Sequence, residues 1–60
     1  MKKFKDLKEG KMYSSDDGYF KFTGMRNESI AEFEQVDSDG NTIDNCIYKT
    51  KNDIQKLYEI

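Results

Sequence analysis

Sixty residues are enough for one small domain, and a chain of this length buries so little surface that its stability is modest. Twelve acidic and ten basic residues give a net charge of −2, so the overall charge implies no strongly electrostatic partner. The single cysteine and the lack of histidine exclude an intramolecular disulfide and a cysteine-based zinc site, and they remove the commonest general base.

The lysines at the start of the chain are followed by no apolar segment of a signal peptide. No stretch approaches the roughly 20 apolar residues that a membrane span needs. We therefore expect a soluble, cytoplasmic protein that has no contact with a membrane.

In chain order, Glu9-Gly10-Lys11 is typical of a turn that leads into a strand over 11–14. After a second turn at Asp16-Asp17-Gly18, residues 19–23 alternate with a period of two, which places Phe20 and Phe22 on one face. A loop over 24–28 then precedes two further strands, over 29–36 and 42–49.

The C-terminal segment permits two interpretations. Asn52 and Gln55 have the spacing of a capping box, and Ile54, Leu57 and Tyr58 recur at helical spacing, which favours a short helix or 3₁₀ turn. Residues 57–60 could equally add a last strand. We predict one all-β domain over 1–60, a small antiparallel barrel or twisted meander of about four to five strands with a short C-terminal helical turn.

The opening Leu7-Lys8-Glu9-Gly10-Lys11-Met12-Tyr13, followed by a strand, a loop and two strands joined by an Asp-Gly turn, resembles the layout of small SH3-like barrels. The resemblance covers the whole chain as topology and implies an architecture without functional residues. The lysine-rich start and the abundance of Ile, Asn, Lys and Asp also resemble small accessory proteins of bacteria and their phages.

The stretch 37–41, DSDGN, resembles part of a calcium-binding loop. In the register that starts at Asp37, however, Thr42 stands where glycine is needed and Tyr48 where the last glutamate ligand belongs, and the register set by Gly40 fails as well. We therefore expect no metal site and no cofactor. A two-residue type I′ hairpin turn at Asp39-Gly40 explains the stretch better.

This turn fixes the pairing of the strands that it joins. It places Val36 opposite Ile43, and a loop over Met25–Glu28 pairs Lys21 with Glu32. One face of the sheet is then the expected core, and it carries Phe20, Phe22, Ala31, Phe33, Cys46 and Tyr48.

The opposite face carries four aliphatic side chains that a solvated sheet face does not need, namely Ile30, Val36, Ile43 and Ile47. The C-terminal Ile54, Leu57 and Ile60 could fold over them, the hairpin could bend so that its tip rejoins a core, or a partner could cover them. The third explanation predicts a partner-binding surface with an acidic rim that favours a basic partner, made of Tyr19, Ile30, Glu32, Glu34, Val36, Ile43 and Ile47.

Catalytic chemistry has little support. Cys46 is expected to be an inert buried thiol, and Glu32 and Glu34 belong to a solvated strand face, so we expect no catalytic residue and no enzyme. The favoured hypothesis is a non-enzymatic protein–protein binding module, such as a small inhibitor or regulator, that docks on another protein or on a second copy of itself.

The second hypothesis is a small barrel that binds single-stranded nucleic acid. Its basic arm would be Lys2, Lys3, Lys5, Lys8 and Lys11, and its stacking rings would be Tyr13, Tyr19 and Tyr58. The acidic remainder of the chain opposes this hypothesis, because it repels phosphates.

Overall fold

The computed structural model describes residues 2–60, and five strands in this part of the chain form one antiparallel sheet. The strands are β1 (Met12–Ser15), β2 (Gly18–Asn27), β3 (Ile30–Val36), β4 (Thr42–Lys49) and β5 (Tyr58–Glu59), in the order β4-β3-β2-β1-β5. A 3₁₀ turn, η1 (Phe4–Asp6), precedes the sheet, and a short helix, α1 (Lys51–Ile54), joins β4 to β5. The predicted all-β meander is confirmed.

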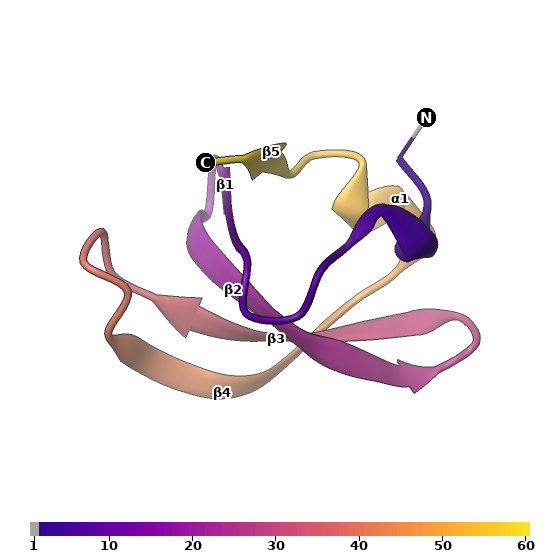
Figure 1. Ribbon diagram of the computed structural model, residues 1–60, viewed down its shortest axis with the longest axis horizontal. Coiled ribbons are helices and arrows are strands. Elements are labelled where there is room, and N and C mark those ends of the chain that lie inside the picture. The colour runs from indigo at the N-terminus through magenta and orange to yellow at the C-terminus, as the bar shows by residue number, and fades with distance from the viewer. Residues whose placement is uncertain (1) are drawn as a thin grey trace.

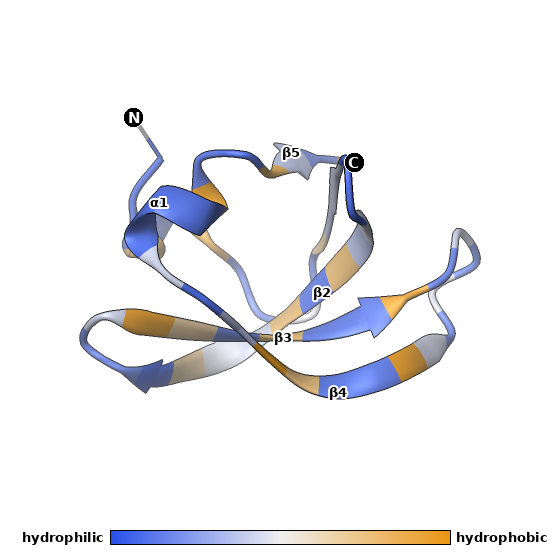
Figure 2. Ribbon diagram, turned by 180° about the vertical axis from the view of Figure 1, so that it is seen from behind, coloured by the Kyte–Doolittle hydropathy of each residue, from blue (hydrophilic) through white to orange (hydrophobic). Residues whose placement is uncertain are grey.

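The sheet curls strongly, so that β5 and α1 lie across the interior from β3 and β4 (Figure 1). Apolar and polar segments alternate along β2, β3 and β4, as a sheet with one buried face requires (Figure 2). The architecture is therefore compatible with a small barrel.

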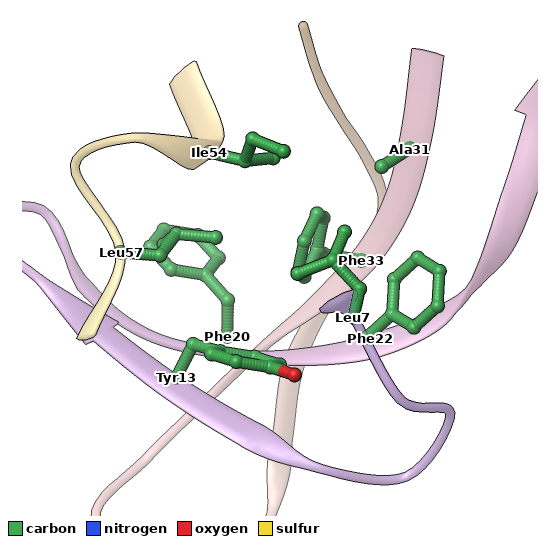
Figure 3. Packing of buried hydrophobic residues seen from close by; sticks show 8 residues of the cluster. All are labelled: Leu7, Tyr13, Phe20, Phe22, Ala31, Phe33, Ile54 and Leu57. Carbon is green, nitrogen blue, oxygen red and sulfur yellow. The ribbon is translucent and has the colours of Figure 1, made fainter. Parts of the chain in front are cut away.

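The core fills the space inside this curl (Figure 3). Phe33 is fully buried at its centre, and the rings of Tyr13, Phe20 and Phe22 lie around it with centroids 6.3, 6.5 and 5.4 Å away. The buried cluster consists of Leu7, Tyr13, Phe20, Phe22, Ala31, Phe33, Ile54 and Leu57. Four of these residues were expected from the strand alternation, and the other four come from other segments of the chain. Aromatic rings thus supply most of the core volume that so short a chain can bury.

The hairpin between β2 and β3 differs from the predicted one. β2 continues to Asn27, which pairs with Ile30, so the connection has two residues instead of the loop expected over Met25–Glu28. The Asn27 side chain accepts a hydrogen bond from the Ser29 amide at 2.8 Å and closes the turn. Lys21 consequently pairs with Glu34 and not with Glu32. From Tyr19 to Phe22 the slip is two residues, which keeps these side chains on their predicted faces, and irregularities between Phe22 and Asn27 change the pairing further.

The expected type I′ turn at Asp39-Gly40 is also wrong. The Gly40 amide donates to the Asp37 carbonyl at 3.0 Å, and the Asp37 amide donates to the Asn41 carbonyl at 2.9 Å. Of the residues in this turn, which all belong to the described part of the chain, only Gly40 has a positive φ, at 89°. These bonds define a three-residue loop that ends in a left-handed glycine. The Asp37 carboxylate accepts amide hydrogen bonds from Asp39 and Asn41, both at 2.9 Å, and this favours the longer loop.

The longer loop changes the pairing of β4. Val36 faces Thr42 rather than Ile43, and further along the hairpin Phe33 faces Ile47 rather than Cys46. Irregularities in the β3–β4 pairing therefore insert extra residues into β4, and Cys46 adopts a left-handed φ of 58°. Cys46 and Tyr48, which the predicted register buried, are exposed, whereas Ile47 packs against the core.

Both C-terminal interpretations are partly right, because α1 is followed by the short strand β5. The capping box is formed by Thr50 and Asp53, not by Asn52 and Gln55. The Asp53 amide donates to the Thr50 hydroxyl at 3.3 Å, and the Thr50 amide donates to the Asp53 carboxylate at 2.9 Å. Gln55 instead binds the start of the chain, since its side chain accepts a hydrogen bond from the Lys2 amide at 2.8 Å.

Candidate functional site

The predicted aliphatic patch does not form one continuous exposed surface. Val36 is only 2% exposed, and Ile30 and Ile47 are half-buried, so Ile43, at 64%, is the exposed aliphatic side chain of the four. The hairpin tip bends back toward β1, since a Cβ on Gly40 would lie 3.6 Å from the Met12 sulfur. This geometry agrees with the explanation in which a bent hairpin hides part of the patch.

The remaining predicted site residues lie on the strand face opposite the core. Tyr19 is 38% exposed, and Glu32 and Glu34 are half-buried. Glu34 is partly neutralised, because its carboxylate lies 3.7 Å from the Lys21 ammonium and accepts a hydrogen bond from the Thr42 hydroxyl at 3.1 Å. Glu32 pairs with Tyr48 on β4, away from Tyr19.

A different set of exposed side chains comes together on β5, β1 and β2. Tyr58 pairs with Ser14, and Ser14 pairs with Tyr19, so the three side chains form one row on the face opposite the core. The Ile60 amide donates to the Met12 carbonyl at 3.4 Å, which places these two residues in the next row. We call this surface the tyrosine face, and it consists of Met12, Ser14, Tyr19, Tyr58 and Ile60.

The tyrosine face is largely apolar and accessible. Tyr58 is 70% exposed and Ile60 is 62% exposed, so their side chains bury little surface within the domain. Tyr13 and Phe20 lie directly behind it in the core, in the same two strands. The buried rings fix β1 and β2, and exposed aromatic side chains on such a rigid support need little reorganisation to bind.

The edge of the tyrosine face is held by contacts of β5. The Lys11 ammonium lies 2.6 Å from the Glu59 carboxylate, and this contact raises the pKa of Lys11 and lowers the pKa of Glu59. Leu57, next to the strand, is buried in the core, and its carbonyl accepts a hydrogen bond from the Lys2 ammonium. These contacts position Tyr58 and Ile60 although β5 has only two residues.

Acidic side chains are concentrated in and next to two loops. The β1–β2 turn, the β3–β4 loop and the strand residues beside them carry six carboxylates, and one of these, Glu34, is paired with Lys21. We call this the acidic end, and its carboxylates are Asp16, Asp17, Glu34, Asp37, Asp39 and Asp44. Amide hydrogen bonds, chiefly from Asn41, lower the pKa of Asp37 and keep it charged.

The opposite end carries η1 and α1, which lie side by side (Figure 1). It carries seven lysines against four carboxylates, those of Asp6, Glu9, Glu28 and Asp53. We call it the basic end, and its lysines are Lys2, Lys3, Lys5, Lys8, Lys49, Lys51 and Lys56. A hollow of about 350 Å³ at this end has Lys3, Phe4 and Lys51 among its lining residues.

A cleft of about 470 Å³ lies between the β1–β2 turn and the segment from α1 to β5. Asp16 and Asp17 line one side, and Lys49 and Lys56 line the other. The Lys49 ammonium is held 4.0 Å above the Phe20 ring, and the third carboxylate of the cleft, Asp53, caps α1. Lys49 and Asp53 are therefore occupied by contacts within the domain.

The residues of the suspected calcium loop make structural contacts instead. The Asp37 carboxylate already accepts the amide hydrogen bonds of its own loop. Among residues 2–60, no group of three or more His, Cys, Asp or Glu side chains is placed to hold a metal ion. Cys46, expected to be buried, is exposed, and a hydrogen bond with its thiol raises the pKa of the neighbouring Tyr48.

Three groups of the nucleic-acid hypothesis are engaged within the domain. Tyr13 is 2% exposed in the core, so its ring is not available to stack on a base. Lys2 lies with its ammonium 5.6 Å from the Tyr13 ring, and Lys11 is paired with Glu59. The other lysines of the arm contribute to the basic end, whereas Tyr19 and Tyr58 belong to a different surface.

No family model matches the chain, and neither a curated protein nor a solved structure is significantly similar to it. Within the described part of the chain, no helix has the length and apolar character needed to cross a membrane. We therefore infer the function from the surface of the domain itself.

Sequence reasoning found only part of this surface. It included Tyr19 but missed Met12 and Ile60 as surface partners, and it considered Tyr58 only for base stacking. The missed signal is the alternation of Tyr58, Glu59 and Ile60, which in a strand puts the two apolar residues on one face.

Proposed function

We propose that this protein is a non-enzymatic protein-binding module and that its partner docks on the tyrosine face. The observation that carries this proposal is the cross-strand row of Tyr58, Ser14 and Tyr19, whose two rings remain exposed beside Ile60. Tyrosine is enriched at protein interfaces, because one rigid side chain supplies apolar area and a polar hydroxyl. A 60-residue domain with such a face fits a small inhibitor or regulator that covers part of a larger protein.

An SH3-like barrel in the cytoplasm remains our proposal for the finer architecture and location. The curled five-stranded sheet of residues 2–60 and the helical turn before its last strand support this architecture.

The proposal is tested with a captured partner. The tagged protein is used to isolate binding proteins from its source cell, one of these is purified, and its dissociation constant is measured for the wild type and for the double variant Tyr19→Ser/Tyr58→Ser. We expect the double variant to weaken binding by at least about tenfold, because interface tyrosines are frequent hot spots. Circular dichroism checks that the variant is folded.

The matched control is Tyr48→Ser, which removes a ring of similar exposure, 45%, from β4. It should leave the affinity within about twofold of the wild type, since surface changes away from a contact have small effects. Equal losses for the control and the double variant, or full binding by the double variant, would contradict docking on the tyrosine face.

A second candidate function is nucleic-acid binding by the basic end, which the seven lysines in and next to η1 and α1 favour. Single-stranded oligonucleotide binding would then fall steeply between about 50 and 200 mM salt. Lys3→Gln/Lys51→Gln should weaken it, and Lys21→Gln at the acidic end should not. No measurable oligonucleotide binding at low salt would exclude this function.

A further inference from the structure

We infer that the partner reaches the tyrosine face with a positively charged segment, in which lysine or arginine alternates with apolar residues. This inference depends on the proposed function, because it names the chemistry of the partner that the same surface binds. It follows from the charges next to the tyrosine face and from which of them remain unpaired.

Two acidic loops lie at one end of the tyrosine row. The β1–β2 turn contains Asp16 and Asp17. Only the pair Ser15–Gly18 separates this turn from the pair Ser14–Tyr19. Tyr19 also pairs with Val36, the last residue of β3, after which the loop with Asp37 and Asp39 begins. The register therefore places both loops next to Tyr19.

Three of these carboxylates have no partner among the residues that the structure describes. Among residues 2–60, the side chains of Asp16, Asp17 and Asp39 form no hydrogen bond or ion pair, although the Lys49 and Lys56 side chains line the cleft opposite Asp16 and Asp17. In the same part of the chain, the carboxylates of Glu9, Glu28 and Glu32 also lack such a partner, whereas those of Asp6, Asp53 and Glu59 accept hydrogen bonds or pair with lysine. Unpaired carboxylates beside an apolar face attract a cationic ligand during approach and favour it in the complex.

The rings of the tyrosine face suit the same ligand. Tyr19 and Tyr58 can contact the aliphatic stem of lysine or arginine, and their ring faces attract the cationic group. The domain already makes contacts of this kind elsewhere, since Arg26 lies 5.0 Å from the Tyr48 ring and Lys49 lies 4.0 Å from the Phe20 ring. Apolar residues of the segment would cover Met12 and Ile60.

The inference is tested with two synthetic peptides of 12 residues, one alternating arginine with leucine and one alternating glutamate with leucine. Each is added to the ¹⁵N-labelled protein, and amide shifts are followed by NMR. We expect the cationic peptide to shift the amides of Ser14, Tyr19 and Tyr58, and the anionic peptide to leave them unchanged. Shifts confined to other residues, or equal effects of both peptides, would overturn the inference.

A charge-matched pair of variants separates the local carboxylates from net charge. Asp16→Asn/Asp17→Asn/Asp39→Asn removes the unpaired charges beside the tyrosine face. The control, Glu9→Gln/Glu28→Gln/Glu32→Gln, removes as many charges from other parts of the domain. We expect the first variant to weaken binding of the cationic peptide by about tenfold at low salt and the control by less than about twofold. Equal weakening would overturn the inference.

The captured partner distinguishes this inference from the proposed function. If Tyr19→Ser/Tyr58→Ser loses the partner but the triple asparagine variant keeps it, the docking surface stands and the cationic chemistry is wrong. If the tyrosine variant keeps the partner, the proposed function itself fails. If the purified protein associates with itself through the tyrosine face, the occupant is the basic end of a second copy, and the inference of a separate cationic partner is wrong.

Discussion

Substitutions at Cys46 test the observed register of β4. Cys46 is an exposed residue with a left-handed φ of 58°, where glycine fits best and β-branched side chains fit worst. We predict that Cys46→Gly leaves the stability unchanged or raises it, and that Cys46→Val lowers it. The register expected from a two-residue turn makes the opposite prediction, because it places Cys46 in extended backbone within the core.

The magnitudes follow from the backbone conformation. A left-handed non-glycine residue costs about 1–2 kcal/mol, and glycine removes this cost but adds about 0.5–1 kcal/mol of unfolded-state entropy. The net effect of Cys46→Gly is therefore between about zero and 1.5 kcal/mol in favour of the folded state. For Cys46→Val, the branched Cβ makes the left-handed conformation worse, by about 1–2 kcal/mol.

The assay is equilibrium unfolding in urea under reducing conditions, followed by circular dichroism and by the fluorescence of the four tyrosines. With a denaturant slope near 1 kcal/mol per molar for so small a domain, the two variants should differ in midpoint by about 1–3.5 M. Cys46→Ala should lie between them. A valine variant that is as stable as the glycine variant, or more stable, would refute the left-handed bulge.

Three further predictions concern the core, the β3–β4 loop and acid. Phe33→Ala removes the ring at the centre of the core and should lower the stability by about 3–5 kcal/mol, which is about the whole stability of a domain this small. The circular dichroism of this variant should therefore be that of an unfolded chain, whereas Phe33→Leu should still fold. Gly40→Val should lower the free energy of unfolding in urea by about 1–2 kcal/mol because of the φ of 89°, and Ser38→Ala should change it by less than about 0.5 kcal/mol. Hydrogen bonds hold the pKa of Asp37 below 3.8, so the stability that they add is present above about pH 4 and is lost as the pH falls further. In thermal unfolding, Asp37→Ala should therefore be less stable than the wild type at pH 7, and the two should become similar near pH 2. An Asp37→Ala variant whose deficit stays constant between these pH values would contradict this assignment.

The strand alternation was sufficient to predict the fold class and half of the core. Phe20, Phe22, Ala31 and Phe33 are buried as expected, although the register of their hairpin slipped by two residues. A slip of two residues changes the cross-strand partners but not the faces, because side chains alternate with a period of two. The core face of β2 and β3 was therefore insensitive to the error in the loop.

The pairing of β4 could not be predicted in the same way. An Asp-Gly pair fits a two-residue turn, but Gly40 fits equally well as the left-handed end of a three-residue loop. Two amide hydrogen bonds to the Asp37 carboxylate favour the second possibility. The left-handed bulge at Cys46 has no sequence signal, because neither glycine nor asparagine stands there, and it exchanges Ile47 for Cys46 on the core side.

The candidate site shows the same limit. Tyr19 was found because it lies in a clear strand, whereas Tyr58 and Ile60 belong to a segment whose sequence fits a helix or a strand. Only the chain reversal by α1 brings that segment beside β1. Val36, which the sequence placed on a partner surface, is buried in the structure, and the bent hairpin tip explains the change.

Docking of a protein partner on the tyrosine face can be observed by NMR shift mapping with the purified partner. Amides of the ¹⁵N-labelled protein are compared with and without the partner at saturation. We expect the largest shifts on Ser14, Tyr19 and Tyr58, with β4 near Tyr48 nearly unchanged. Shifts that are concentrated on β4 and absent from β1 and β5 would contradict docking on the tyrosine face.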